Sequence, residues 1–141
     1  MKTIKRVSAL LLAVIMLICV SSCTNSVEDA SVWESAIYTG DTTVGQGDKT
    51  IVVEVSAEGK SIELTVRSDA EMLGEALIEN ALIEGDETQY GIYIKKVNGI
   101  PADYDVDGYY WSLCKNGEYL MTGADMTPIA DGEHYELIRT K

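Results

Sequence analysis

The chain of 141 residues has one histidine, three cysteines, two prolines and no phenylalanine. With His134 as the only histidine, no histidine-based metal triad can form, and no general base is evident beside Cys114 or any serine. The sequence motifs of zinc proteases, serine hydrolases and phosphate-binding loops are absent as well. We therefore expect no catalytic residues and predict that the protein is not an enzyme.

Basic side chains are also scarce, with 11 Lys and Arg against 23 Asp and Glu and a formal net charge of −12. Residues 1–22 hold three of the positive charges and no negative one, so a chain that loses them would carry −15. Nothing basic then remains to contact a phosphate backbone or an anionic lipid surface. We expect no nucleic-acid partner.

The N-terminus has the pattern of an export signal. Three basic residues within the first six precede an apolar run over residues 9–20, which is too short to span a membrane. The next residues, Val20–Cys23 ("VSSC"), resemble the lipobox of bacterial lipoproteins, whose cysteine receives a diacylglyceryl group and becomes the first residue after cleavage. We predict a lipoprotein signal peptide over residues 1–22 and a lipid on Cys23 that anchors the protein to the outer, extracytoplasmic face of the cell membrane. A secreted protein with an incidental cysteine is the alternative.

Lipidation would also decide the cysteine chemistry. Cys19 lacks small residues before it and is the weaker lipidation candidate, so Cys114 would be the one free thiol of the mature chain. An intramolecular disulfide, a two-cysteine redox site and a cysteine zinc site are then excluded.

Residues 23–48 are predicted to be the lipidated cysteine and a flexible tether, because the segment has few apolar residues and no sustained period. A coil of about 25 residues would hold the domain roughly 25–30 Å from its anchor. Trp33 and Tyr38 are the exceptions. They touch the bilayer interface, pack on the domain or remain disordered, and disorder is the simplest interpretation.

Residues 49–141 have the pattern of one folded domain. Alternating apolar residues predict a hairpin of strands over 50–55 and 61–66, and Ser68 with Glu71 predicts a capping box that opens a helix, with Gly85 as its stop. Further strand regions are predicted within residues 90–100, 109–122 and 134–140. The order β-β-α-β-β-β predicts an α+β fold, a β-grasp-like roll with one helix packed on a mixed sheet.

Three aspartates stand at alternate positions in "DYDVDG", where Asp103, Asp105, Asp107 and Gly108 fit positions 1, 3, 5 and 6 of an EF-hand calcium loop. Position 12, which needs a bidentate glutamate, is Cys114, and strands replace the flanking helices. Aspartate and glycine also favour turns by themselves. The stretch is therefore a weak calcium candidate, and a turn into the next strand is the better interpretation.

Aromatic residues gather on this loop and the adjoining strands: Tyr93, Tyr104, Tyr109, Tyr110, Trp111 and Tyr119. Such side chains suit flat ligands and protein partners, and the alternative is a core in which tyrosine replaces phenylalanine. Alternation places Trp111 and Leu113 on one face of their strand, so we expect Trp111 in the core and Tyr109 or Tyr110 near the surface.

The segment over residues 109–137 resembles a bacterial family of domains of unknown function that is similar to the C-terminal β domain of transcobalamin and intrinsic factor. The matching features are Tyr110-Trp111, Asn116-Gly117, Gly123, and Asp131-Gly132-Glu133 leading into Glu136-Leu137. With the preceding hairpin, helix and aspartate loop, the resemblance spans roughly residues 50–140. In the vitamin carriers, cobalamin lies between this β domain and an α-helical barrel, which the present chain lacks.

The resemblance implies a non-catalytic ligand-binding module, with cobalamin or another corrinoid as the sharpest candidate ligand and no required cofactor. It favours Tyr110, Trp111, Met121 and Gly123 as ligand-binding residues. Two main hypotheses follow: a surface-tethered module that binds a flat small molecule for uptake, or a protein-interaction or adhesion module on the cell surface. An enzyme comes third, and would need several titratable groups converging in one cleft.

Overall fold

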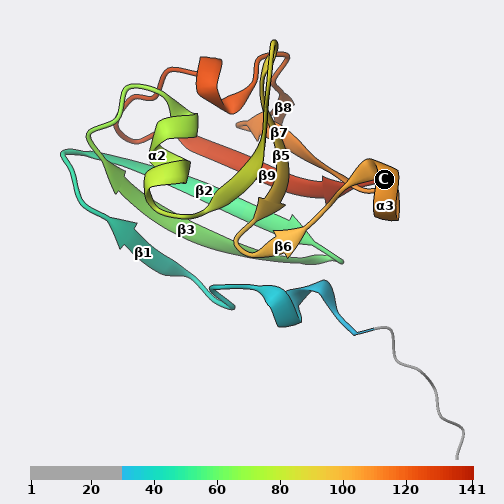
Figure 1. The fold of residues 1–141 in the computed structure, drawn as a ribbon. Helices are drawn as coiled ribbons and strands as arrows, with labels where there is room; N and C mark the ends of the chain where they lie inside the picture. Colours follow the sequence, from blue (N-terminus) through green and yellow to red (C-terminus); the bar gives the residue numbers. More distant parts are fainter. Residues whose placement is uncertain (1–29) are drawn as a thin grey trace, which may run out of the picture.

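The computed structural model of the chain describes residues 30–141 (Figure 1). The predicted signal peptide and the predicted lipidation site, Cys23, lie outside the described residues. None of the helices in the described part has the length and apolar character needed to cross a bilayer.

Six strands form a mixed sheet in the order β1-β3-β2-β9-β7-β8 (Figure 1). The β1–β3 and β2–β9 pairs are parallel and the other pairs are antiparallel. Every second side chain of the central strands is buried, which is the alternation that the sequence shows. The strands are β1 (Thr42–Gly45), β2 (Lys49–Ala57), β3 (Lys60–Ser68), β7 (Tyr110–Lys115), β8 (Glu118–Tyr119) and β9 (His134–Thr140).

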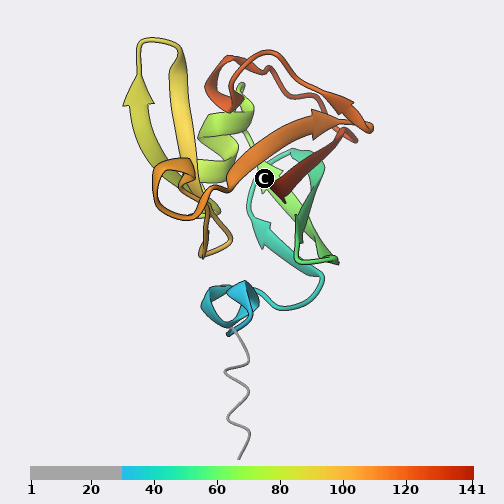
Figure 2. The same ribbon diagram turned by 90° about the vertical axis from the view of Figure 1, so that its right-hand side faces the viewer.

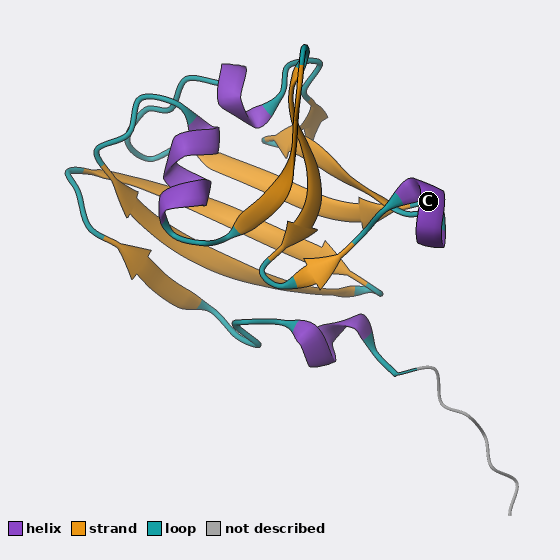
Figure 3. Ribbon diagram, viewed as in Figure 1, coloured by secondary structure: helices purple, strands orange, loops and turns teal. Residues whose placement is uncertain are grey.

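A second layer covers one face of this sheet (Figures 2 and 3). It holds the helix α2 (Leu73–Glu79) and a three-stranded antiparallel sheet in the order β4-β5-β6. Leu73, Ala76 and Leu77 of the helix are fully buried in the core. The remaining elements are β4 (Ile83–Thr88), β5 (Gly91–Val97), β6 (Ile100–Pro101), the one-turn helix α3 (Tyr104–Asp107) and the 3-10 turns η1 (Val32–Ser35) and η2 (Ala124–Met126). The predicted α+β architecture, one main helix on a mixed sheet, is confirmed.

The start of α2 differs from the predicted capping box. The helix begins at Leu73 with Met72 as its N-cap, and no side chain caps it. Ser68 instead ends β3, where its hydroxyl donates to the Glu79 carboxylate and accepts the Ala70 N–H. The prediction was wrong because Met72 is held extended by a bridge to Pro128, a contact between distant parts of the chain.

Gly85 does not stop the helix, which ends at Glu79 with Asn80 as its C-cap, but lies within β4 at a bulge. A Cβ atom there would lie 2.0 Å from the Tyr93 carbonyl oxygen, so this position has no room for a side chain. The strand β4, which forms a hairpin with β5, was not foreseen, since its residues are nearly all exposed and acidic or small.

The prediction of a flexible tether is wrong for residues 31–45, which pack on the domain. Trp33 is buried, and its indole Nε1 donates a hydrogen bond of 2.9 Å to the Ala57 carbonyl. The side-chain amide of Asn98 holds the backbone of Tyr38. Its Oδ1 accepts the Tyr38 N–H at 2.9 Å, and its Nδ2 donates to the Tyr38 carbonyl at 2.8 Å. Four residues of β1 then pair with β3. Of the alternatives for Trp33 and Tyr38, packing on the domain is therefore the one that the structure shows. The edge strand β1 leaves no sustained period in the sequence, so pattern analysis missed it.

Candidate functional site

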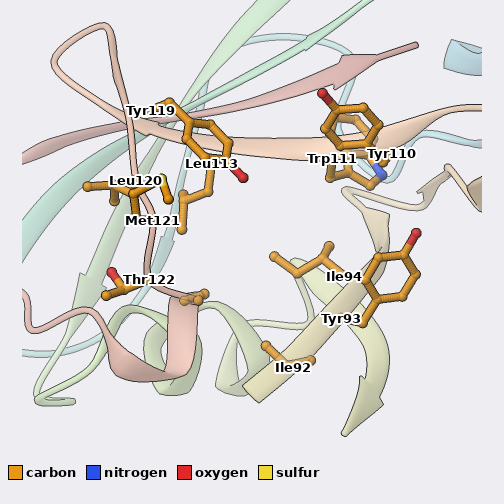
Figure 4. A pocket seen from close by; sticks show the side chains of 12 residues that line it. Ile92, Tyr93, Ile94, Tyr110, Trp111, Leu113, Tyr119, Leu120, Met121 and Thr122 are labelled. Carbon is orange, nitrogen blue, oxygen red and sulfur yellow. The ribbon is translucent and has the colours of Figure 1, made fainter. Parts of the chain in front are cut away.

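A cleft of about 230 Å³ opens between β5 and β7. Figure 4 shows Ile92 and Ile94 of β5 facing Leu113 of β7 across the cleft, with residues 120–122 along one side. Its lining consists of Ile92, Tyr93, Ile94, Tyr110, Trp111, Leu113, Tyr119, Leu120, Met121, Thr122, Gly123 and Ala124.

The cleft exists because β5 and β7 belong to different sheets. Residues 91–94 of β5 pair only with β4, and residues 110–113 of β7 pair only with β9. Each strand therefore has one long edge with no strand partner within residues 30–141. The segment after β8 bridges the two strands at one end, where Leu120 donates its N–H to the Leu113 carbonyl and Asp125 accepts the Ile92 N–H.

All four residues predicted to bind a ligand line this one cleft: Tyr110, Trp111, Met121 and Gly123. Trp111 and Leu113 are buried and Tyr110 is exposed, as the alternation along β7 predicts. Met121 is 91% exposed at the rim. Their binding role stays a prediction, but they now form one surface.

Sequence patterns did not find the β5 side of the cleft. Ile92 and Ile94 lie in a region that was predicted only as a strand, and Tyr93 appeared only as one of six clustered aromatics. Nothing local indicates that residues 92–94 lie opposite residues 110–113, since this contact depends on how the two sheets separate. The one sequence feature that could have indicated the β5 side of the cleft is Tyr93, an aromatic residue on the outward face of an alternating strand.

The chemistry that the cleft offers is apolar contact and aromatic stacking, with tyrosine and threonine hydroxyls as its polar side-chain groups. No carboxylate, imidazole or amine is among its lining side chains. The indole Nε1 of Trp111 is buried and has no hydrogen-bond partner among the described residues. The cleft can therefore hold an apolar or flat group, but it brings no acid and base together.

The aspartate loop forms α3, a single helical turn rather than a calcium loop. Asp103 caps it by accepting the Asp105 N–H at 3.2 Å, and Asp107 accepts the Asp103 and Tyr109 N–H groups at 3.3 and 2.8 Å. Gly108 ends the turn with φ +74°, a left-handed conformation that glycine adopts without strain.

Two of the three aspartates also face basic side chains. Asp107 pairs with Arg139 at 3.0 Å and Asp103 with Lys95 at 3.5 Å. The Arg139 guanidinium also lies 3.8 Å from the centre of the Tyr109 ring, which fixes the loop to β9. Within residues 30–141 no three His, Cys, Asp or Glu side chains are grouped to hold a metal ion, so Asp103, Asp105 and Asp107 do not fit a calcium site.

Lys95 also pairs with Asp86 at 2.7 Å. The hydrogen bond to Asp86 is the largest influence on Lys95 and raises its pKa.

Two further polar groups singled out in the sequence lie outside the cleft. His134 faces Glu54, Glu63 and Glu136 at 3.5–4.0 Å on the main sheet. Cys114 is buried in β7 and is the free thiol of the described residues. Neither is among the residues that line the cleft.

A network at one end of β9 carries the strongest pKa shifts. Burial disfavours the charged form of Glu133, but hydrogen bonds from Lys115 and Tyr135 and from the Ala130 N–H outweigh it and lower the pKa of Glu133 to about 2. Burial, followed by the neighbouring Glu133 carboxylate, raises the pKa of Tyr135. The Lys115 ammonium donates to Glu133 at 2.6 Å, so this network is fully paired.

Solved structures share this fold, and seventeen chains match it. A protein from Ruminococcus gnavus ATCC 29149, described as a "putative metal binding protein", is 34% identical with a TM-score of 0.63, covering 67% of this chain and 98% of that one. Haptocorrin in complex with Cbi is 24% identical with a TM-score of 0.54, covering 70% of this chain and 26% of haptocorrin. No curated protein sequence matches.

The haptocorrin likeness concerns the fold alone, and this chain corresponds to about a quarter of that protein. The family model described as "Domain of unknown function (DUF4430)" matches residues 70–135, which include the helix α2, the hairpin β4–β5 and the cleft. Because this model matches and the Ruminococcus gnavus protein is 34% identical over nearly its whole length, the chain belongs to the DUF4430 family.

Proposed function

We propose that this protein is a non-catalytic ligand-binding module, lipid-anchored on the outer face of the cell membrane, whose cleft takes a flat small molecule for uptake. A corrinoid is the leading candidate ligand. The observation that carries the proposal is the meeting of Tyr110, Trp111, Met121 and Gly123 in one open cleft with apolar and aromatic walls. The fold shared with haptocorrin, which is in complex with Cbi, supports the choice of ligand class.

The size of the cleft limits how a ligand can sit in it. Ligand sites that enclose a small molecule have volumes of about 300–1,000 Å³, and this one has about 230 Å³. A corrinoid would therefore lie with one face or edge against Tyr110 and Met121 and leave its other face open. That open face would be available to a second protein, such as an importer.

The position of the cleft suits a surface anchor. In both ribbon views the described chain enters at η1, at the opposite end of the domain from the tip of the β4–β5 hairpin and η2 (Figures 1 and 2). Residues 119–124 of the cleft precede or belong to η2. A lipid on Cys23 would thus hold the cleft on the side away from the bilayer.

The test is an equilibrium titration of soluble residues 24–141 with cyanocobalamin and with dicyanocobinamide, followed by corrinoid absorbance and tryptophan fluorescence. We expect saturable binding with Kd near 1 μM, about −8 kcal/mol. Tyr110→Ala and Met121→Ala should weaken it at least tenfold, whereas Tyr104→Ala, which changes an exposed tyrosine of α3 outside the cleft, should not. Absence of saturable binding by the wild-type domain would refute the corrinoid proposal.

A protein-interaction module is the second candidate, and the exposed rim favours it. Tyr90 is 82% exposed, Tyr119 62%, Met121 91% and Met126 64%, in the β4–β5 turn and in or near β8 and η2. Exposed apolar residues that gather in this way mark protein contacts. This function predicts that whole cells bind the domain, that Met121→Ala reduces this binding, and that corrinoids do not compete with it.

A further inference from the structure

The indole Nε1 of Trp111 is one of two buried side-chain polar atoms in residues 30–141 that have no hydrogen-bond partner. The other, Oε2 of Glu136, belongs to β9 and does not line the cleft. Trp111 is 7% exposed and borders the cleft. Buried polar groups in folded proteins are almost always paired. An unpaired indole N–H at a candidate binding site therefore points to a partner that the ligand brings.

This indole differs from the other polar side chains of the cleft. The Thr122 hydroxyl already lies 3.2 Å from the Thr127 hydroxyl, within hydrogen-bond distance, and the tyrosines of the lining stand exposed to water at the rim. Trp111 is the one lining residue with a side-chain N–H group. A donor that is shielded from water discriminates strongly between ligands, because a ligand without an acceptor leaves it unpaired.

The main chain of Trp111 adds polar groups at the same edge of β7. The Leu113 carbonyl accepts the Leu120 N–H, so the N–H and C=O groups of Leu113 point away from β9. Trp111 stands two residues earlier and has the same orientation, and β8 pairs only with Cys114 and Lys115. One main-chain donor and one main-chain acceptor thus lie at this edge with no strand partner in the described part of the chain.

The charge of the surroundings selects among the groups that a ligand could offer. No Lys, Arg or His lines the cleft, and the chain has a formal net charge of −12. A ligand carboxylate would accept from the indole but would find no cation to pair with, which makes its desolvation costly. A carboxamide is neutral, its oxygen accepts and its N–H groups donate. It therefore matches both the indole N–H and the main-chain groups of the edge.

An acceptor reaches the buried Nε1 only when a side chain of the rim moves. Figure 4 shows the rings of Tyr110 and Tyr93 at the end of the cleft where Trp111 lies. Both tyrosines are exposed, so each can change its rotamer without loss of core packing. The indole itself is fixed by its burial in β7. The donor is thus held in place under side chains that can open.

We propose that Trp111 is a specificity-determining residue of the cleft, whose indole N–H donates to the oxygen of a neutral carboxamide on the edge of the ligand. This inference rests on the proposed function, since it requires a small molecule in the cleft, and it names the chemical group that the cleft selects. Rings that carry carboxamides are accepted, whereas rings that carry carboxylates or no acceptor bind more weakly.

The test is an NMR titration of ¹⁵N-labelled residues 24–141 with three probes that share one flat ring: benzamide, benzoate and toluene. The chain has two tryptophans, so the spectrum holds two indole N–H signals, and Trp111→Phe assigns them. We expect benzamide to shift the Trp111 indole signal saturably at millimolar concentrations and to leave the Trp33 signal in place. Benzoate and toluene should bind at least threefold more weakly than benzamide.

The variant Trp111→Phe keeps an aromatic wall and removes the N–H group. It should weaken benzamide binding about fivefold, leave toluene binding unchanged and so abolish the preference for the amide. A residue with a purely structural role would weaken the binding of all three probes alike. Trp33→Phe is the matched control, because it removes an indole N–H that is paired with Ala57 outside the cleft.

A parallel titration with dicyanocobinamide, whose ring carries carboxamides, separates this inference from the proposed function. If Trp111→Phe binds cobinamide as tightly as the wild type does, the role of Trp111 is overturned and the corrinoid site stands. If cobinamide does not bind but benzamide shows the expected preference, the corrinoid is refuted and the role of Trp111 stands. Benzamide that binds no better than toluene, or that leaves the Trp111 indole signal unmoved, overturns the inference.

Discussion

The two tryptophans of the described chain are equally buried, at 7% exposure each, but they stand in opposite environments. The indole Nε1 of Trp33 donates to the Ala57 carbonyl, and the Lys60 ammonium lies 4.4 Å above its ring. The indole Nε1 of Trp111 has no partner in residues 30–141, and its side chain borders the cleft. Burial alone therefore does not separate a structural aromatic from one at a candidate site, whereas the pairing of its polar atom does.

The same contrast extends to the surroundings of each tryptophan. Near Trp33, the side-chain amide of Asn98 makes two hydrogen bonds to the Tyr38 backbone. In the cleft that Trp111 borders, Tyr119 and Met121 stand exposed. The N-terminal side thus contributes to stability and the cleft side is left open for contacts.

The largest effect that we expect comes from Trp33. Trp33→Ala should lower the free energy of unfolding by about 3–5 kcal/mol, because it empties a buried site and removes the hydrogen bond to the Ala57 carbonyl. Trp33→Phe should cost about 1 kcal/mol more than Trp111→Phe, since only Trp33 loses a hydrogen bond. Urea unfolding measures both. Stability of Trp33→Ala within 0.5 kcal/mol of the wild type would mean that residues 31–45 do not belong to the fold.

The next effect concerns the paired network of Lys115, Glu133 and Tyr135. Because the folded state lowers the pKa of Glu133 from its usual 4.5 to about 2, its contribution is complete above pH 4.5 and is lost as the pH falls toward 2. After allowance for partial exposure, this contribution is on the order of 2 kcal/mol. The free energy of unfolding, measured between pH 2 and 7, should fall less steeply with decreasing pH in Glu133→Gln than in the wild type. Glu118→Gln, which changes an exposed carboxylate that forms no salt bridge within residues 30–141, should keep the wild-type slope.

Gly74 couples the helix to the cleft. A Cβ atom there would lie 2.9 Å from the Asp125 backbone, so Gly74→Ala must push α2 and η2 apart. We expect a loss of about 1–3 kcal/mol, although alanine favours a helix over glycine. Gly40→Ala, with open space around the new atom, is the matched control. A stabilised Gly74→Ala domain would show that the packing of α2 against η2 is not tight.

The smallest effect on stability belongs to the rim of the cleft. Met121→Ala and Tyr119→Ala change exposed side chains, so each should alter the free energy of unfolding by less than about 0.5 kcal/mol. The same variants should lose ligand binding in the titration, because the proposed ligand would lie against these side chains. A rim variant that unfolds easily but binds normally would reverse the contrast between the two sides of the molecule.

Much of the fold follows from local pattern. Alternation gave the strands β2 and β3, and the strand region predicted within residues 109–122 holds β7 and β8, which form a hairpin at Asn116-Gly117. The four predicted ligand-binding residues came from the family resemblance and proved to line one cleft. Within the helix, the backbone of η2 occupies the space that a side chain at Gly74 would fill.

The sequence by itself determined the strands of the hairpin, the presence of a helix after them and the burial of Trp111, because these depend on periods of two or about four residues and on side-chain type. Only the tertiary structure decided the docking of Trp33, the strand β4, and the meeting of β5 with β7 around the cleft. These features join residues far apart in the chain through single contacts. The physical reason for the division is that a repeated pattern records which face of an element is buried, but not which distant element covers it or leaves it open.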